Sequence, residues 1–220
     1  MLNLYTLISD VYEDFLDKAL FTTYLGLLKR YAQPVEALEI GCGTAKLSRM
    51  LAKRGYTMHA LDDDEAMLTQ ASRLAYEEGL DITFLKHDIL RGSPGRYALV
   101  LMPHDLLNHV DGSGLSRLSR HVSDSVLPGG LLIFDHLREQ YLKNLVGHQE
   151  TFDETEPFVW DVLPNERGAL IHRIRRGEDT ATQSAWYHSE ARLIKSFPAF
   201  DVIGKAEDDI RNVVLMKKEK

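Results

Sequence analysis

The sequence has little cysteine, no long apolar run and no excess of basic residues, and each absence narrows what the protein can be. Cys42 is the one cysteine among 220 residues, so the chain cannot form an internal disulfide. No amino-terminal stretch has the basic-then-apolar form of a secretory signal. From these two features we expect a reducing, cytoplasmic setting.

Membranes and nucleic acids are disfavoured as partners. Charges or glycines break the apolar segments within about 10 residues, which is too short to cross a bilayer. The 33 acidic residues outnumber the 26 basic ones and give a formal net charge of -7, which repels a phosphate backbone. The length allows one main domain with a small appended cap, as a monomer or a homodimer.

Strand and helix patterns alternate through the first two thirds of the chain. Apolar residues recur at helical spacing over residues 9–31. Apolar runs predict strands at residues 35–40, 57–61, 82–86, 97–102 and 131–135, and helical patterns lie between them at 45–53, 64–78 and 113–126. This α/β alternation predicts a Rossmann-like, doubly wound and mostly parallel seven-stranded sheet.

The pattern changes near residue 148. The later sequence predicts antiparallel strands at residues 152–161, 169–175, 184–190 and 192–203, and a last strand at 212–217. We therefore expect three parts: a core with its amino-terminal helix over residues 1–148, a small antiparallel β insertion over 149–203, and the last core strand and tail over 204–220.

A glycine turn follows the first predicted strand. Gly41 and Gly43 have no Cβ, so a ligand can approach their backbone closely. Asp62 lies 19 residues after Gly43 at the end of the second predicted strand, where a carboxylate can accept both hydroxyls of a ribose. Glycine can also serve such a turn for geometric reasons alone.

The residue at position 46 separates two classes of nucleoside cofactor. A dinucleotide-binding turn needs glycine or alanine three positions after its second glycine, so that the helix can receive the pyrophosphate. Lys46 occupies that position. A long side chain there argues against a pyrophosphate and leaves open a cofactor that has no phosphate.

Five segments resemble, in order, the motifs of the class I S-adenosylmethionine-dependent methyltransferases. They are residues 38–45 (LEIGCGTA), 60–68 (ALDDDEAML), 84–89 (FLKHDI), 97–102 with 105–109 (DLLNH), and 127–132 (LPGGLL). The resemblance implies transfer of a methyl group from S-adenosyl-L-methionine to nitrogen, oxygen or carbon of a small-molecule acceptor. Family members that act on planar amide or base nitrogens often carry an Asn-Pro-Pro-Tyr run after the fourth strand, and this chain has none.

The resemblance also assigns cofactor roles. It implies that the glycines face the methionine portion, Asp62 holds the ribose and Asp88 accepts from the adenine amino group. The full set of expected cofactor-binding residues is Tyr12, Glu39, Gly41, Gly43, Asp62, Asp63, Met67, Asp88, Ile89 and Met102. Glu39 is expected to organise the loop, and Cys42 is expected to be packed within it rather than to act as a nucleophile.

The acceptor side is less well defined. His104, Asp105 and His109 follow the fourth strand and His136 ends the fifth, so each is a candidate for a base at the carboxyl edge of the sheet. Asp105 can instead cap the next helix with His109 packed beneath it, and His136 can mark a helix start. We expect no metal, because residues 104 and 109 are five apart and do not share a helix face.

Aromatic residues in two distant segments are expected around the acceptor. Tyr5 joins Tyr12 on the leading segment, and the predicted insertion carries Trp160, Trp186, Tyr187 and His188. Packing within the insertion is the alternative role for the tryptophans. Two other functions stay open: a nicotinamide-dependent oxidoreductase, which Lys46 disfavours, and a non-catalytic nucleoside-binding scaffold.

Overall fold

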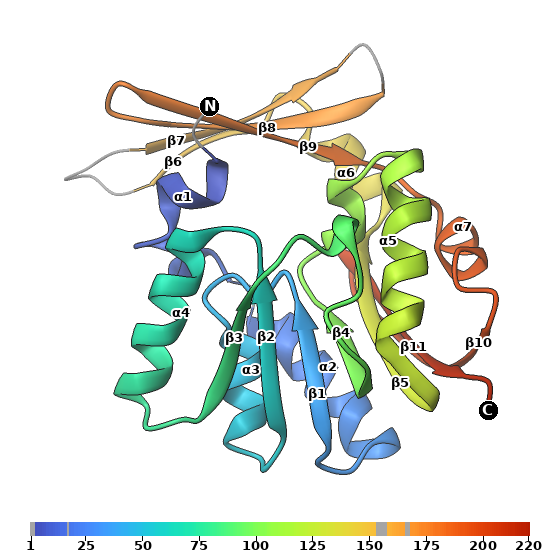
Figure 1. The fold of residues 1–220 in the computed structure, drawn as a ribbon. Helices are drawn as coiled ribbons and strands as arrows, with labels where there is room; N and C mark the ends of the chain where they lie inside the picture. Colours follow the sequence, from blue (N-terminus) through green and yellow to red (C-terminus); the bar gives the residue numbers. More distant parts are fainter. Residues whose placement is uncertain (1–2, 17, 153–157, 166–167) are drawn as a thin grey trace.

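A seven-stranded sheet forms the centre of the molecule (Figure 1). The computed structural model describes residues 3–16, 18–152, 158–165 and 168–220. The strands of this core sheet are β1 (Glu36–Ile40), β2 (Thr57–Asp62), β3 (Ile82–Lys86), β4 (Tyr97–Met102), β5 (Val126–Leu137), β10 (Phe200–Glu207) and β11 (Arg211–Lys218). Their order is β10-β11-β5-β4-β1-β2-β3, with β11 antiparallel to both of its neighbours. The Rossmann-like, mostly parallel fold predicted from the sequence is confirmed.

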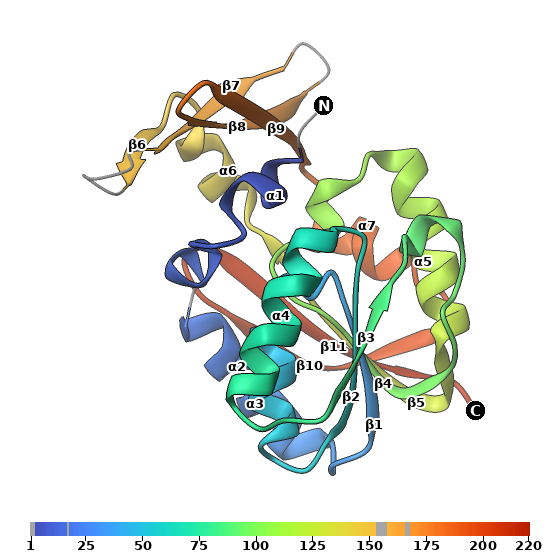
Figure 2. The same cartoon turned by 60° about the vertical axis from the view of Figure 1, so that its left-hand side comes forward.

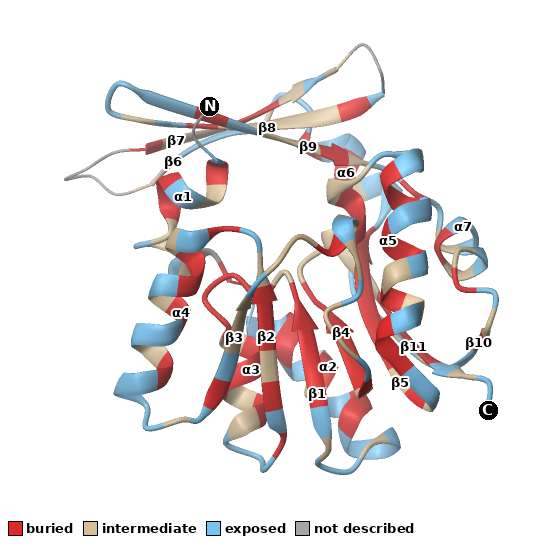
Figure 3. Cartoon of the chain, in the orientation of Figure 1, coloured by how far each residue is buried: buried red, intermediate tan, exposed pale blue. Residues whose placement is uncertain are grey.

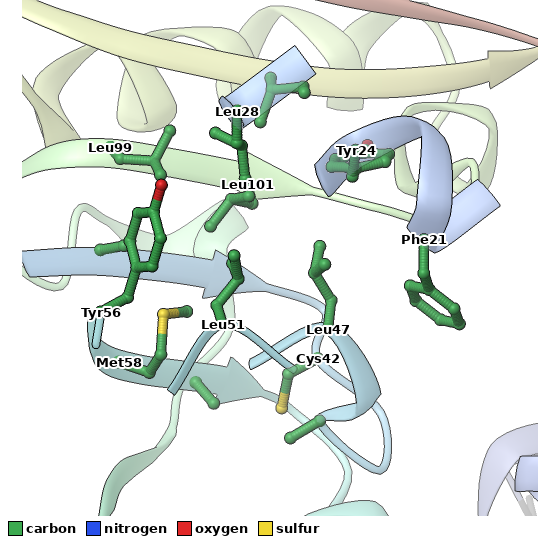
Figure 4. Packing of buried hydrophobic residues seen from close by; sticks show 14 of the residues in the cluster. Phe21, Tyr24, Leu28, Cys42, Leu47, Leu51, Tyr56, Met58, Leu99 and Leu101 are labelled. Atoms are coloured by element: carbon green, nitrogen blue, oxygen red, sulfur yellow. The ribbon is translucent and has the colours of Figure 1, made fainter. Parts of the chain in front are cut away.

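Helices cover both faces of the core sheet. They are α2 (Lys18–Tyr31), α3 (Lys46–Ala52) and α4 (Glu65–Glu77) on one face, and α5 (Gly112–Ser125) and α7 (Glu190–Lys195) on the other. Successive side chains of a strand point to opposite faces. Leu99 and Leu101 of β4 therefore pack toward α2 and α3 (Figure 4), and Val100 and Met102 pack toward α5. The central strands are consequently buried on both sides (Figure 3).

A second sheet lies across the carboxyl ends of the core strands (Figures 1 and 2). This cap sheet contains β6 (Gln149–Phe152), β7 (Phe158–Pro164), β8 (Ala169–Arg176) and β9 (Asp179–Trp186), all paired antiparallel in chain order. The short helices α1 (Leu4–Ile8) and α6 (Glu139–Leu145) pack against it through apolar side chains. The cap sheet and α1 therefore cover the edge at which ligands bind in sheets of this kind.

The prediction of a single helix over residues 9–31 is wrong. The chain forms α1, the 3₁₀ helix η1 (Tyr12–Phe15) and α2, with Leu16 in an extended conformation after η1. Glu13 gives the physical reason, because its carboxylate accepts from Thr44, Lys46 and Arg49 at the start of α3. These bonds hold η1 against the glycine turn, which a continuous helix would not reach.

The prediction of a strand over residues 192–203 is also wrong. Ser189 caps α7 by accepting from the backbone N–H of Arg192, and Leu193 is buried on the helix face toward the core. The strand that follows, β10, belongs to the core sheet and is the seventh strand that the sequence did not locate. The strand expected at 184–190 lies earlier, at β9, and part of the one expected at 152–161 falls on residues 153–157, outside the described residues.

Within the described ranges, no helix is long and apolar enough to cross a membrane.

Candidate functional site

The turn between β1 and α3 exposes its backbone to a cavity. Gly41 and Gly43 have φ values of +67° and +52°, in the left-handed region that favours glycine. A Cβ on Gly43 would lie 3.0 Å from Cε1 of Tyr12, and one on Gly41 would lie 3.0 Å from Cδ1 of Leu106. Ala45 also has a positive φ, of 57°. A side chain at Gly41 or Gly43 would therefore press on Leu106 or Tyr12.

Asp62 joins the glycine turn to the end of β2. Its Oδ2 accepts from the backbone N–H of Gly43 at 2.8 Å, and its Oδ1 accepts from the N–H of Asp64 at 2.9 Å. Burial raises the pKa of Asp62 to about 6, and the neighbouring carboxylates of Asp63 and Asp64 act in the same direction. Each carboxylate oxygen keeps a second lone pair. The side chain can therefore hold the turn and still accept from a ligand.

Most of the expected cofactor-binding residues line this cavity, which we call the loop cavity, of about 230 Å³. They are Tyr12, Gly41, Gly43, Asp62, Asp63, Met67, Asp88 and Ile89. Asp88 caps the 3₁₀ helix η2 (Ile89–Arg91) by accepting from the N–H of Leu90 at 2.8 Å. The turn, the tip of β2 and the end of β3 thus form one continuous wall.

Glu39 and Met102 do not line the loop cavity. Glu39 lies behind the turn, with 1% of its surface exposed, and accepts from the backbone N–H and the hydroxyl of Ser48 in α3. Burial raises its pKa to about 7. Met102 is fully buried among the side chains that face α5. Glu39 is therefore placed to hold α3 beneath the turn, and Met102 is placed to pack the core.

Cys42 lies inside the turn and is buried. Burial raises the pKa of its thiol well above the ordinary value, and the nearby carboxylates of Asp62 and Glu39 raise it further. A thiol in this environment is protonated and a weak nucleophile. Its position matches the expected packing role.

Two consecutive residues after β4 adopt a backbone conformation that non-glycine residues rarely adopt. The φ values are 59° for His104 and 49° for Asp105. Such conformations are costly and persist where the surrounding structure enforces them, often at functional sites. Here the backbone N–H of Asp105 donates to Oδ2 of Asp135 at 2.9 Å, which fixes the turn to the end of β5.

A buried ion network lies directly below this turn. Nη1 of Arg211, from β11, is 2.5 Å from Oδ1 of Asp105 and 3.0 Å from Oδ2 of Asp135. Tyr24 donates its hydroxyl to Oδ1 of Asp135 at 2.8 Å. Although burial opposes ionisation, Arg211 and His109 hold the pKa of Asp105 well below its usual range. Asp105 is thus ionised, and its side chain does not cap the following helix.

His109 lies at the end of the 3₁₀ helix η3 (Leu106–His109) and faces Asp105. Its Nε2 is 3.5 Å from Oδ2 of Asp105, and the hydroxyl of Tyr5 lies 3.4 Å from its Nδ1. An ionised carboxylate can only accept, so a proton shared by Asp105 and His109 resides on Nε2. Nδ1 is then left with a lone pair.

A second cavity, which we call the cap cavity, opens between the cap sheet and the same end of the core sheet and has a volume of about 350 Å³. It shares Tyr5, Tyr12, His104, His109 and Gln183 with the loop cavity. Asp105, Arg211 and Trp160 also line it. The expected candidates His104, Asp105 and His109 therefore meet where the two cavities join.

His136 is not brought to either cavity. It follows Asp135 on β5, and because neighbouring side chains on a strand point to opposite faces, it turns toward α7. Its Nε2 lies 3.4 Å from Oε2 of Glu190, in a separate hollow that Tyr187 also lines. Trp186 and His188 likewise line neither cavity, and His188 Nε2 lies 2.8 Å from the carbonyl oxygen of Val110.

Three residues of the site were not singled out from the sequence. Arg211 balances the two buried carboxylates, Glu13 fastens η1 to the turn, and His172 lines the cap cavity. Arg211 is separated from Asp105 by 106 positions, so no local spacing pointed to it. Within the described residues, no group of three or more His, Cys, Asp and Glu side chains is arranged to hold a metal ion.

Residues 37–130 match a family model described as a methyltransferase domain. The chain is 29% identical over 148 residues to the ubiquinone biosynthesis O-methyltransferase of Coxiella burnetii strain RSA 331, covering 65% of this chain and 58% of that protein. It is 26% identical over 152 residues to the ribosomal protein L11 methyltransferase of Campylobacter fetus subsp. fetus, covering 68% and 52%. The chain thus spans less than two thirds of the length of these relatives.

Solved structures share the fold over nearly the whole chain. The CcbJ methyltransferase from Streptomyces caelestis has a TM-score of 0.81 at 16% identity and covers 99% of both chains. An S-adenosylmethionine-dependent methyltransferase from Clostridium acetobutylicum ATCC 824 has a TM-score of 0.78 at 19% identity and covers 97% of both chains. At these identities the similarity shows the fold alone.

Proposed function

We propose that this chain, whose residues 37–130 match a methyltransferase domain, transfers the methyl group of S-adenosyl-L-methionine to a small-molecule acceptor. The observation that carries the proposal is the joining of two cavities at one set of residues. The loop cavity suits the cofactor and the cap cavity suits the acceptor. The relatives named above include one protein of ubiquinone biosynthesis and one that is named for a ribosomal protein, so their names alone do not fix the acceptor.

The residues of the loop cavity fit this cofactor. Gly41 and Gly43 line the cavity without a Cβ, so a ligand can approach their backbone closely. Asp62 offers buried carboxylate lone pairs to ribose hydroxyls, and Asp88 lies where it can accept from the adenine amino group. Lys46 donates to Glu13 at 2.9 Å instead of facing the cavity, so the start of α3 presents no pyrophosphate site.

When bound, the cofactor supplies a methyl carbon that is already electrophilic because it is attached to a sulfonium. The protein must then orient the acceptor, exclude water and accept a proton where the acceptor has one to lose. Tyr5 and Tyr12 close the junction from the amino-terminal side, and His109 can take the proton while Asp105 holds its ring. The cap sheet and α1 exclude water from above. No covalent enzyme intermediate is required.

Calorimetric titration tests the cofactor directly. S-adenosylmethionine and S-adenosylhomocysteine should both bind the folded wild-type protein, and reduced nicotinamide cofactor should not. The Gly43→Ala variant should bind S-adenosylhomocysteine about tenfold more weakly, equivalent to about 1.4 kcal/mol, because its new Cβ pushes Tyr12 into the cavity.

Gly79→Ala is the matched control for this variant. Gly79 has a φ of +65° but no atom within 4 Å of an added Cβ, so the substitution adds backbone strain of about 1–2 kcal/mol without touching the cavity. It should leave binding unchanged. The proposal is wrong if the folded wild-type protein binds no S-adenosylmethionine at millimolar concentration, or if it prefers the nicotinamide.

A further inference from the structure

The wall of the cap cavity that faces the cap sheet is apolar and aromatic. Leu4, Ile8, Leu137, Leu145, Ile174 and Ile210 supply the aliphatic part. Tyr141, Phe152, Phe158 and Trp160 supply the rings, and Phe152 and Phe158 are stacked with their centroids 5.0 Å apart. Such a surface favours an acceptor whose body is apolar, because hydroxyls that lose their water against aliphatic and aromatic carbons gain no hydrogen bonds from them.

Trp160 and His172 form a flat, uncharged plate in this wall. Their ring planes are 12° apart with centroids separated by 5.6 Å. Trp160 Nε1 donates to His172 Nδ1 at 3.1 Å. An indole nitrogen can only donate, so Nδ1 carries no proton, and burial lowers the pKa of His172 to about 4. The imidazole is therefore neutral near pH 7, and a flat ring can stack on the plate without meeting a charge.

The one guanidinium of the cap cavity is already paired with carboxylates. Among its described lining residues, Arg211 is the one lysine or arginine, and its guanidinium is paired with both Asp105 and Asp135. The cavity thus has no cation left to neutralise a carboxylate or phosphate on a ligand. Burying such an anion beside two aspartates would be costly, so the chemistry favours an acceptor that is uncharged where it enters.

The junction of the two cavities accommodates an aromatic hydroxyl. The phenol oxygen of Tyr5 lies 3.4 Å from Nδ1 and 3.3 Å from Nε2 of His109. Asp105 on the other side of the imidazole stabilises the imidazolium that forms when a proton arrives. A phenol needs this help, because its ordinary pKa of about 10 leaves little phenolate at neutral pH.

We propose that the methyl acceptor is an uncharged phenol whose ring lies against Trp160 and His172 and whose hydroxyl meets His109 at the junction. The inference rests on the proposed methyltransferase function. The phenol oxygen gives its proton to His109 and forms the new O–CH₃ bond as the methyl C–S bond breaks, and the electron pair of that bond returns to sulfur. The products are an aryl methyl ether, S-adenosylhomocysteine and a protonated His109, which releases its proton to solvent.

Three small probes test this inference by binding, with or without S-adenosylhomocysteine present. 4-Butylphenol and 4-butylbenzoate have the same body and differ in charge, and glucosamine represents a polar acceptor. We expect 4-butylphenol to bind at least tenfold more tightly than either of the others in calorimetry. With S-adenosylmethionine, mass spectrometry should detect 4-butylanisole. Equal or tighter binding of the benzoate or glucosamine would overturn the inference.

The two tryptophans report where the probe binds. Trp160 lines the cap cavity and Trp186 does not, and the chain contains only these two. 4-Butylphenol should quench the emission of the Trp186→Phe variant as it does the wild type, and should leave that of the Trp160→Phe variant unchanged. Quenching that persists in Trp160→Phe would place the probe elsewhere and contradict the inference.

This design separates the two proposals. Phenol binding does not depend on the cofactor, so loss of S-adenosylmethionine binding with the phenol preference intact would remove the proposed function and keep the pocket assignment. Cofactor binding without any preference for the phenol would remove the pocket assignment and keep the proposed function.

Discussion

Replacing Arg211 with methionine is expected to lower the free energy of unfolding by about 3–5 kcal/mol, the usual cost of removing one partner of a buried ion pair. The variant would leave Asp105 and Asp135 as uncompensated carboxylates, and Asp135 is fully buried. Methionine retains much of the volume of the side chain, so the lost charge dominates. Urea unfolding monitored by circular dichroism measures the change.

Lys217→Met on the same strand is the matched control, because Lys217 is exposed and surface substitutions usually change stability by less than about 0.5 kcal/mol. Adding Asp105→Asn to Arg211→Met should restore part of the loss, since one buried charge is then removed. If Arg211→Met changed the free energy of unfolding as little as Lys217→Met does, the ion network would not stabilise this part of the fold.

The pH dependence of this loss has a defined sign. The pKa of Asp105 is depressed in the folded protein, so its stabilising contribution is present above the pKa of the unfolded chain, about 3.9, and disappears as the pH falls further. The stability gap between wild type and Arg211→Met should therefore keep its full size from neutrality down to about pH 4 and narrow as the pH falls below that value.

The His109→Gln variant is expected to lower kcat for 4-butylphenol by about 10²–10⁴-fold, the range that a positioned general base contributes. Glutamine cannot take the phenol proton, but its size is similar and the loop cavity is left intact. KM for S-adenosylmethionine and the affinity for S-adenosylhomocysteine should therefore be unchanged. Steady-state kinetics with 4-butylphenol and S-adenosylmethionine measure kcat and KM, and calorimetry measures the affinity for S-adenosylhomocysteine.

Asp105 acts through His109 and is a positioning residue. Asp105→Asn should reduce kcat while leaving KM for S-adenosylmethionine unchanged, because the imidazolium that forms on His109 loses its neighbouring negative charge. His59→Gln is the control, because His59 pairs with Glu36 at the start of β1 and lines neither cavity. A His109→Gln enzyme with wild-type kcat would assign the proton transfer to another group or to solvent.

The glycine turn and Asp62 were predictable because they follow from short-range spacing. Each lies at the end of a buried strand, and parallel pairing brings the ends of such strands to one edge of the sheet. The register of β1 with β2 then places the glycine turn beside Asp62. The resemblance to the third family motif assigned Asp88 and Ile89 to the cofactor, and both residues line the loop cavity. These features depend on a few neighbouring residues and on rules that hold for all such sheets.

Other parts of the site could not be predicted because they depend on long-range pairing. Arg211 reaches Asp105 through the antiparallel pairing of β11 with β5, which no local pattern encodes. His136 was expected at the site, but strand alternation turns it away once Asp135 faces Arg211. Ser189 is a helix cap whose signal was hidden in an apolar stretch that also fits a strand.

The most direct test of the account is the affinity of the Asp62→Asn variant for S-adenosylhomocysteine, measured by calorimetry near pH 8, where Asp62, with a pKa of about 6, is ionised in the wild type. The control is Asp81→Asn. Asp81 is exposed and precedes β3 at the amino end of the strand, whereas the cofactor site lies at the carboxyl ends of the strands. We predict that Asp62→Asn loses about 1–3 kcal/mol of binding free energy and that Asp81→Asn binds as the wild type does. Wild-type affinity in Asp62→Asn would contradict the assignment of the glycine turn and the tip of β2 as the cofactor site.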